Sequence, residues 1–250
     1  MAPRTDPAAV VVGRRRTAGV VAVVLAISGI GLAGCGVVSA ARKVTNAVES
    51  NKAAIDAFTS TMKAGGTATF EATYVTTGSS PETVTYAVKP PKGLSFRAVP
   101  SGGGSGAVDL VVNSSGEFAC SVTSGSGSAA RSGWSCQKLG SANAAAQNKI
   151  FDLYTPAHWI TFLRDFSLAA GLAGDAVTSS TMTVNGFSMR CVDFRASGIP
   201  GTSTICTTAQ GILGYVKVAS DPTSFEIKAY TTAPPAAVFE LPRGARVTTG

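Results

Sequence analysis

Few residues in the sequence have the types and spacing that catalysis requires. The single histidine, His158, lies near the start of an expected helix, where we interpret it as a surface or partly buried side chain, not a general base. The segment Gly103–Ala107 comes near the G-x-S-x-G turn of hydrolases but fails at its last position. The carboxylates that could form an acid–base pair are few and scattered, namely Asp109, Glu117, Asp152 and Asp165. Because motifs for binding metals, phosphates or dinucleotides are also missing, we expect no enzyme, no cofactor and no metal.

The chemistry that the sequence does support is lipid modification of a cysteine. An uncharged run, Thr17–Gly34, follows Arg14–Arg16 and ends at Leu32-Ala33-Gly34-Cys35. A basic segment, an apolar segment and small residues before a cleavage point are typical of a secretory signal peptide. The last four residues match the bacterial lipobox, a motif at which the leader is removed and the cysteine is acylated. We therefore predict a signal peptide over residues 1–34 and a lipidated Cys35.

The same run has an alternative interpretation as an uncleaved anchor. Its length of about 18 residues is at the lower limit for a helix that crosses a bilayer. Both interpretations place residues 36–250 outside the cytoplasmic membrane. We predict a protein anchored by lipid to the cell membrane on its extracytoplasmic face, with residues 35–50 as the lipidated N-terminus and tether.

The four remaining cysteines predict disulfides. An even number of cysteines in an exported chain is typical of a disulfide framework. Of the three possible pairings we favour Cys120–Cys136 and Cys191–Cys206, because each pair flanks a turn-like segment between expected neighbouring strands. Each bond would close a loop of about 15 residues, worth roughly 3 kcal/mol in the chain-entropy picture. Neither pair has the short C-x2-4-C spacing that zinc sites use.

The net charge restricts the class of partner. The chain has a formal charge of +7, but its basic residues do not form runs interleaved with aromatic residues. Nucleic acid binding is therefore not expected. A mild positive excess is compatible with a weak attraction to anionic lipid head groups. Residues 51–250 are enough for one domain with a sizeable core.

Helical periodicity occurs in two regions. In Val37–Ala64 the apolar residues recur at intervals near three, four and seven, which predicts an amphipathic helix that packs from about Asn51 onward. We expect it to end at Gly65-Gly66 with glycine in the left-handed conformation. Ala142–Tyr154 predicts a second helix, and Thr155-Pro156 predicts the N-cap and first position of a third. An aromatic stripe on the third helix is typical of a face that covers a sheet.

A period of two dominates the rest of the chain and predicts strands. The expected strands span residues 68–74, 83–88, 94–98, 108–112, 117–122, 177–184, 187–196, 203–208, 212–219 and 224–231. Asn185-Gly186 suits the positive dihedral angles of a type I′ hairpin turn. Roughly ten antiparallel strands with two clusters of helices predict an α+β fold, in which helices cover the concave face of a large bent antiparallel sheet.

The order of these features resembles a known family. The lipobox cysteine and the N-terminal helix are followed by Thr69–Tyr74, Lys89-Pro90-Pro91-Lys92, Cys206, Gly211-Ile212-Leu213, Phe225-Glu226 and Phe239-Glu240-Leu241-Pro242. This order is similar to that of actinobacterial LolA-like lipoproteins, the superfamily of the LppX/LprG-type lipid carriers. The resemblance implies a LolA-like half-barrel over residues 51–250, whose sheet and helices enclose an apolar cavity for acyl chains.

A cavity of that kind needs a large apolar lining. Burying an acyl chain replaces contact with the bilayer at about 0.8 kcal/mol for each methylene. The residues expected to line it are Phe70, Tyr74, Tyr86, Phe96, Leu110, Phe118, Trp159, Phe162, Phe166, Leu213 and Tyr215. For each of them an ordinary position in a packed core is the alternative.

The preferred function is that of a membrane-anchored envelope lipoprotein that binds a lipid, lipoglycan or other apolar ligand and carries or presents it. Acyl chains would be buried between the concave sheet and the helices of Tyr154–Leu168, whose movement would open the cavity. An envelope transporter is a further possible partner, which the sequence does not identify. The alternative function is a surface-tethered interaction or scaffolding module with a filled core and no lipid cargo.

Overall fold

The computed structural model describes residues 34–78, 81–101, 106–123, 133–173, 177–195, 200–220 and 223–249. The chain divides into two compact units, residues 1–40 and residues 41–250, and the fold below is that of the second unit. The predicted signal peptide lies outside the described residues up to Ala33, and of Cys35 only the backbone is described. Cleavage and acylation therefore stay predictions from the sequence.

The helices lie close to their predicted bounds. They are α1 (Gly34–Gly66), α2 (Ser141–Asp152), α3 (Pro156–Ala173) and the short 3-10 helix η1 (Ala236–Phe239). Helix α1 is continuous through the predicted tether of residues 35–50. Among the described residues, no helix combines the length and the apolar character needed to cross a bilayer.

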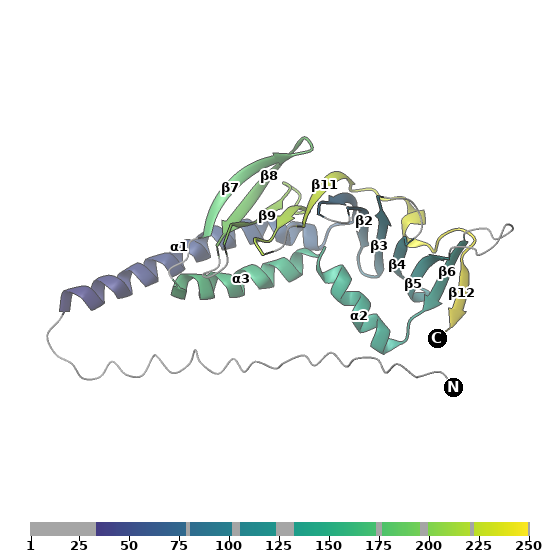
Figure 1. The fold of residues 1–250 in the computed structure, drawn as a ribbon, viewed down its shortest axis with the longest axis horizontal. Helices are drawn as coiled ribbons and strands as arrows, with labels where there is room; N and C mark the ends of the chain where they lie inside the picture. The colour runs from purple at the N-terminus through teal and green to yellow at the C-terminus, as the bar shows by residue number, and fades with distance from the viewer. Residues whose placement is uncertain are drawn as a thin grey trace, which may run out of the picture. The chain divides into compact units, whose positions relative to one another are not determined.

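The described strands form one twelve-stranded sheet (Figure 1). They are β1 (Phe70–Thr76), β2 (Glu82–Lys89), β3 (Gly93–Pro100), β4 (Val108–Asn113), β5 (Gly116–Thr123), β6 (Gly133–Lys138), β7 (Val177–Val184), β8 (Phe187–Phe194), β9 (Ser203–Thr207), β10 (Leu213–Lys217), β11 (Ser224–Thr231) and β12 (Arg246–Thr249). Their order in the sheet is β12-β6-β5-β4-β3-β2-β1-β11-β10-β9-β8-β7. The predicted α+β fold with a large, mostly antiparallel sheet is confirmed.

One strand pair corrects the prediction of a purely antiparallel sheet. Strand β12 pairs with β6 in parallel, with Val247 opposite Cys136. The other pairs are antiparallel, and β1 has the alternating burial that the sequence predicts, whereas β4 and β9 each bury three residues in a row. The β7–β8 hairpin turns at Asn185 and Gly186, whose φ angles of 51° and 84° are the positive values expected there.

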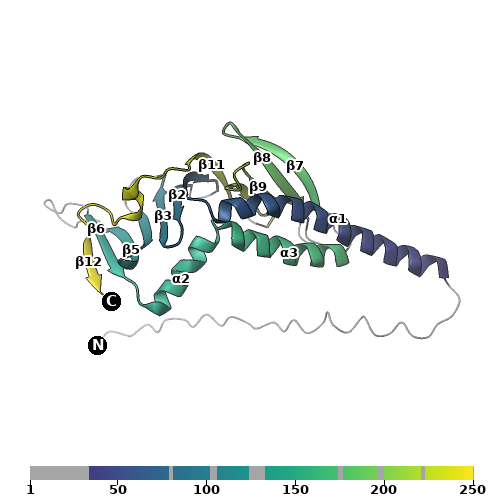
Figure 2. The ribbon, with the colours of Figure 1, turned by 180° about the vertical axis from the view of Figure 1, so that it is seen from behind.

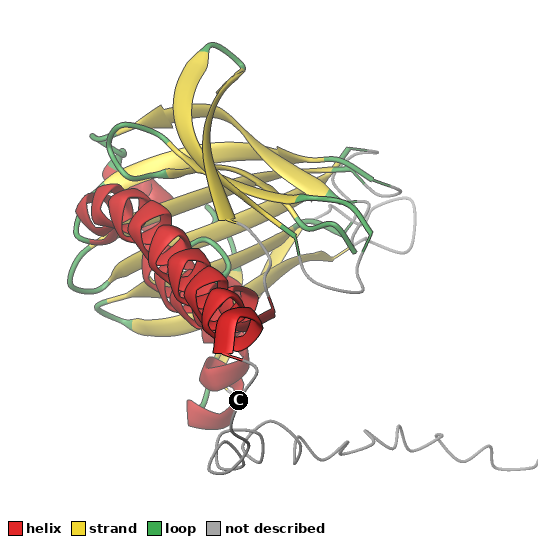
Figure 3. Cartoon of the chain, turned by 90° about the vertical axis from the view of Figure 1, so that its left-hand side faces the viewer, coloured by secondary structure: helices red, strands yellow, loops and turns green. Residues whose placement is uncertain are grey.

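The three α-helices lie on one face of the sheet, called the inner face here (Figures 2 and 3). Because successive residues of a strand point to opposite faces, the strand register shows which side chains share this face. Ala72, Tyr86, Phe96 and Leu110 stand opposite one another across β1 to β4, and all four are buried. The inner face is therefore the apolar one in this half of the sheet, as expected of the LolA-like architecture inferred from the sequence.

The C-terminal segment covers part of the opposite, outer face. Phe239 of η1 is buried, and its carbonyl oxygen accepts a hydrogen bond from Asn113 Nδ2 at 3.0 Å. Leu241 packs against Phe118 and the disulfide of β5 and β6. In the register, Phe118 stands opposite Val111, one residue along from the inner-facing Leu110. Phe118 therefore belongs to the outer face.

Helix α1 ends in direct backbone contact with the β9–β10 turn. A Cβ atom on Gly65 would lie 2.1 Å from the carbonyl oxygen of Gly211, and one on Gly211 would lie 2.3 Å from that of Thr61. Gly211 has a φ of 78°, whereas Gly65 and Gly66 are not among the glycines with positive φ. The predicted left-handed end of α1 is thus wrong. Glycine is needed at position 65 because it lets the backbone of α1 approach the backbone of the β9–β10 turn closely, and not because the position requires unusual dihedral angles.

Both predicted disulfides are confirmed. Cys120–Cys136 joins β5 to β6, and Cys191–Cys206 joins β8 to β9. In each pair the two cysteines stand directly opposite one another in the antiparallel register. The bonds therefore fix neighbouring strands in the two halves of the sheet.

Candidate functional site

The inner face carries an aromatic floor, defined here as Phe70, Tyr74, Tyr86 and Phe96 of β1, β2 and β3. All four side chains are buried, and the rings of Phe70 and Tyr86 lie 5.9 Å apart. Leu110 of β4 is buried in the same cluster. Full burial of a side chain of this size contributes roughly 1.5–3 kcal/mol to folding. The structure thus brings together five of the residues predicted to line a ligand cavity, while their ligand role stays a prediction.

Tyr154, at the junction of α2 and α3, covers the aromatic floor. Its side chain is only 8% exposed, and its ring stacks on that of Tyr86 at an interplanar angle of 25°. The distances from its ring centroid are 5.6 Å to Tyr74, 5.6 Å to Tyr86, 5.3 Å to Phe96 and 5.5 Å to Phe225. Tyr154 therefore occupies the space above the floor that a ligand on this face would need.

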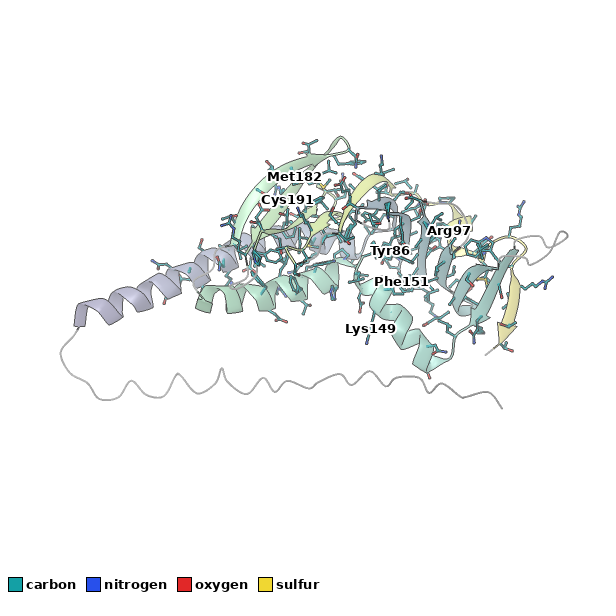
Figure 4. The ribbon with its side chains drawn as sticks, viewed as in Figure 1. Tyr86, Arg97, Lys149, Phe151, Met182 and Cys191 are labelled. Carbon is teal, nitrogen blue, oxygen red and sulfur yellow. A yellow bond between two sulfur atoms is a disulfide. The ribbon has the colours of Figure 1, made fainter. Side chains whose placement is uncertain are left out.

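Helix α2 contacts the floor through a second side chain on the same helix face. Phe151 is buried, and its ring lies 6.4 Å from that of Tyr86 (Figure 4). Two other apolar residues of this region, Ile150 and Leu153, are exposed at 37% and 47%. We call residues 141–166 the arm. The described apolar side chains of the arm divide into those buried on the sheet, which include Phe151 and Tyr154, and those that remain accessible, which include Ile150 and Leu153.

The polar atoms of the site are phenol hydroxyls held in the neutral form. The hydroxyl of Tyr74 donates a hydrogen bond to the carbonyl oxygen of Leu213 at 3.0 Å, and burial raises the pKa of Tyr74. Burial, with a smaller contribution from Asp152, raises the pKa of Tyr86. Burial also raises the pKa of Tyr154 to about 12. These hydroxyls are therefore neutral at physiological pH and suit packing, not proton transfer.

The predicted residues of α3 belong to a second cluster, shared with α1. Trp159 is buried, and its Nε1 donates a hydrogen bond to the carbonyl oxygen of Leu153 at 2.8 Å. Phe166 packs against Phe194 of β8 with ring centroids 4.5 Å apart. Phe162 lies between Trp159 and Phe166 and is 39% exposed. The aromatic stripe thus covers the sheet, as the periodicity indicates, but leaves one ring accessible.

The last three predicted residues are not part of the aromatic floor, although Leu213 accepts the hydrogen bond from Tyr74 and Tyr215 packs against the same core cluster. Leu213 is buried with the α1 and α3 side chains of the second cluster. Tyr215 is partly buried on β10, opposite Cys206 in the register. Phe118 packs on the outer face beside the Cys120–Cys136 disulfide. The predicted lining is therefore divided among separate packing clusters.

Cavities bounded by described residues lie outside the aromatic floor. One of about 450 Å3 lies between α1 and the β7–β8 hairpin, and another of about 330 Å3 lies beside Pro90, Pro91 and Phe239. None of the eleven predicted ligand residues is among the described residues that line either cavity.

The catalytic candidates do not form a site in the described part of the chain. His158 is exposed and lies edge-on to Trp159, while Asp109 pairs with Arg97 between β4 and β3. Asp152 and Asp165 are exposed on the arm. No group of histidine, cysteine and acidic residues among the described residues is placed to hold a metal ion.

Comparison with known proteins gives remote structural similarity only. The sequence matches no protein-family model and no curated protein. The crystal structure of MucB aligns with a TM-score of 0.44 at 13% identity, over 76% of this chain and 64% of that chain. MucB in complex with MucA(peri) aligns with a TM-score of 0.41 at 12% identity, over 75% and 60%. The chain spans less than two thirds of the length of these MucB chains, and the LppX/LprG type stays an expectation from the sequence.

Proposed function

We propose that this protein binds the apolar part of a lipid between the aromatic floor and the arm, outside the cytoplasmic membrane, and carries or presents it. The observation that carries the proposal is the position of Tyr154, a single ring at a helix junction that covers four aromatic side chains. A ring held at such a junction can leave when the helices move apart. The space it vacates would be lined by the aromatic floor.

The energetics of this exchange are balanced enough to be reversible. Each aromatic pair that Tyr154 makes is worth about 0.5–1.5 kcal/mol beyond the burial of its area. An acyl chain that enters in its place gains about 0.8 kcal/mol for each buried methylene. A chain of several methylenes would therefore offset the loss of the tyrosine contacts, while a short one would not.

The accessible apolar residues of the arm support an entry route. Ile150 and Phe162 are exposed, although apolar side chains of this size are usually buried. The hydrogen bond from Trp159 Nε1 to Leu153 connects the α2–α3 junction to the ring that packs against Phe162. A lipid tail could contact these side chains before it reaches the floor.

A second candidate function is a membrane-tethered interaction module with a filled core. The specific observation in its favour is that Tyr74, Tyr86 and Tyr154 already pack against one another with almost no exposed surface. We infer a non-enzymatic role in either case, because the carboxylates and the histidine of the described residues are not arranged for acid–base or nucleophilic chemistry.

Native mass spectrometry distinguishes the two candidates. Residues 36–250, which lack the predicted leader and acylation site, are purified after export without detergent, and any bound molecule is extracted with organic solvent. A lipid in stoichiometric amount supports the carrier. A folded protein that stays empty after incubation with membrane lipids refutes it and favours the interaction module.

A surface variant locates the bound lipid. Phe162→Asp is preferred because Phe162 is half-exposed, whereas Trp159→Asp would place a charge at a buried position. Phe162→Asp is expected to reduce lipid retention with secretion unchanged. The matched control is Val247→Asp, which alters an exposed apolar residue of β12 that stands opposite the outer-facing Cys136. Equal retention by the two folded variants would contradict the proposed location.

A further inference from the structure

The cavity between α1 and the β7–β8 hairpin has one apolar wall and one polar wall. Its volume is about 450 Å3, within the range of small-molecule sites. Helix α1 contributes Ala57 and Phe58, and the hairpin contributes the rest of the lining, namely Ser179, Ser180, Thr181, Arg190 and Cys191. Figures 1 and 2 both show α1 running beside this end of the sheet.

The polar wall is rich in hydrogen-bond donors that are not used within the described residues. Thr181 and Arg190 stand opposite one another in the β7–β8 register, and Ser179 lies two residues along on the same side. The side chains of these three residues make no hydrogen bond or ion pair with the described part of the chain. Ser180 points the other way and donates to Asp193. On the side of the hairpin that carries Arg190, one cation and two hydroxyls therefore have no partner among the described residues.

The apolar wall is held in a fixed position. Phe58 is buried in the cluster that joins α1 to β8, β9 and β10. Asn51 is also buried, and its Oδ1 accepts a hydrogen bond from the backbone N–H of Val177, the first residue of β7, at 2.9 Å. This contact ties α1 to the strand that forms the far side of the cavity, so the space between them does not depend on a mobile side chain.

We propose that this cavity binds a single-chain amphiphile with an anionic head group. Arg190 would hold a carboxylate or phosphate, which the planar guanidinium recognises with two parallel hydrogen bonds. Ser179 and Thr181 would donate to the same oxygens, and the described residues of the lining include no acidic side chain that would oppose an anion. The chain of the amphiphile would lie along Ala57 and Phe58. This site is separate from the aromatic floor and does not need the arm to open.

The first test is calorimetric titration of residues 36–250, purified after export, with dodecanoate and with dodecyl phosphate. We expect one equivalent of either to bind, and we expect dodecyl maltoside, which has the same chain and an uncharged head, to bind at least tenfold more weakly. Acetate and inorganic phosphate test the head alone. Equal affinity for the maltoside, or affinity for acetate or inorganic phosphate that matches that of the amphiphiles, would overturn the proposal.

Two pairs of variants place the ligand in this cavity. Arg190→Gln is expected to weaken dodecanoate binding at least tenfold, while Arg243→Gln, a change at an exposed arginine outside the lining, leaves it unchanged. Ala57→Trp fills the cavity from an exposed helix position and is expected to abolish dodecanoate binding. Ala53→Trp, one turn earlier on the same helix and outside the lining, is expected to leave that binding unchanged. Binding that survives Arg190→Gln and Ala57→Trp but is lost in Phe162→Asp would overturn this site and support the floor beneath the arm.

Discussion

The ring of Tyr154 stacks on that of Tyr86, with centroids 5.6 Å apart and planes at 25°. Tyr154 belongs to the helix junction and Tyr86 to the middle of the sheet, so this one contact joins the arm to the aromatic floor. The arrangement corresponds to a closed state, in which a side chain of the protein itself covers the apolar surface. The predictions below test this closure and the contacts that position it.

Alkaline pH should weaken the closure. Burial raises the pKa of Tyr154 from 10.0 to about 12, so the folded state favours the neutral phenol. The resulting stability is fully present below pH 10 and is lost as the pH rises through about 12. A shift of this size corresponds to at most about 3 kcal/mol.

The free energy of unfolding in urea, measured at pH 9 and pH 11.5, tests this effect. We expect Tyr154→Phe to lose less stability over the interval than the parent protein. The control is Tyr230→Phe, because the hydroxyl of Tyr230 donates to Gln210 at the surface. If the pH dependence of Tyr154→Phe is the same as that of the parent, the buried hydroxyl contributes nothing to it.

The contact between Gly65 and Gly211 should tolerate no side chain. Gly65→Ala would place a Cβ 2.1 Å from the carbonyl oxygen of Gly211, and forced overpacking of this kind costs about 1–3 kcal/mol or more. Gly66→Ala is the matched control, because a Cβ there meets nothing within 4 Å. Because alanine is a better helix former than glycine, Gly66→Ala should leave the stability of the protein unchanged or raise it by up to about 1 kcal/mol. Equal melting temperatures for the two variants would show that α1 does not dock on the turn as described.

Asp109 should make stability depend on pH in the acidic range. Its side chain is buried, Oδ2 accepts a hydrogen bond from Arg97 Nε at 3.0 Å, and Oδ1 has no partner among the described residues. Desolvation outweighs the effect of Arg97 and raises the pKa of Asp109 above 3.8. The stability that this shift contributes is present below pH 3.8 and is lost as the pH rises through the folded-state value.

Asp109→Asn removes this titration and keeps an oxygen that can accept from Arg97. As the pH rises from about 3.8, we expect the free energy of unfolding of Asp109→Asn to fall less than that of the parent. The difference between the two proteins should be roughly 1.4 kcal/mol for each unit by which the pKa of Asp109 is raised. Asp165→Asn, at an exposed position of α3, controls for the change in net charge. Parallel stability curves for Asp109→Asn and the parent would contradict the assignment.

Local patterns predicted the elements and the disulfides well, because both depend on residues that are near in sequence or regular in spacing. The pairing of Cys191 with Cys206 followed from two strands joined by a short segment. The parallel pairing of β12 with β6 could not be predicted, since residues 246–249 are all exposed and have no alternating pattern. Their partner strand is more than a hundred residues away.

The candidate site was harder to predict because alternation gives two faces without saying which one is inner. Phe118 lies in an alternating apolar pattern like those of the inner-facing residues. It stands opposite Val111 in the strand register, however, and therefore lies on the outer face. Phe151 and Tyr154 were not predicted to line the site. Their spacing of three residues just before Thr155-Pro156 was the available signal, since it puts both rings on one face at a helix junction.

The most direct test of the closed arm is the binding of N-phenyl-1-naphthylamine, an apolar fluorescent probe, to Tyr154 variants. Tyr154→Ala removes the ring that covers the floor, while Leu153→Ala changes an exposed side chain of the same junction and serves as the control. Because loss of a buried aromatic residue costs about 3–5 kcal/mol, Tyr154→Leu is measured as well, and cooperative thermal unfolding of each variant is checked.

We expect both Tyr154 variants to bind the probe at least tenfold more tightly than the parent protein, with Leu153→Ala unchanged, since the ligand no longer has to displace the ring. If folded Tyr154→Ala and Tyr154→Leu are merely less stable and bind the probe no better than Leu153→Ala, the aromatic floor is ordinary core and the account of a lipid site beneath the arm is wrong.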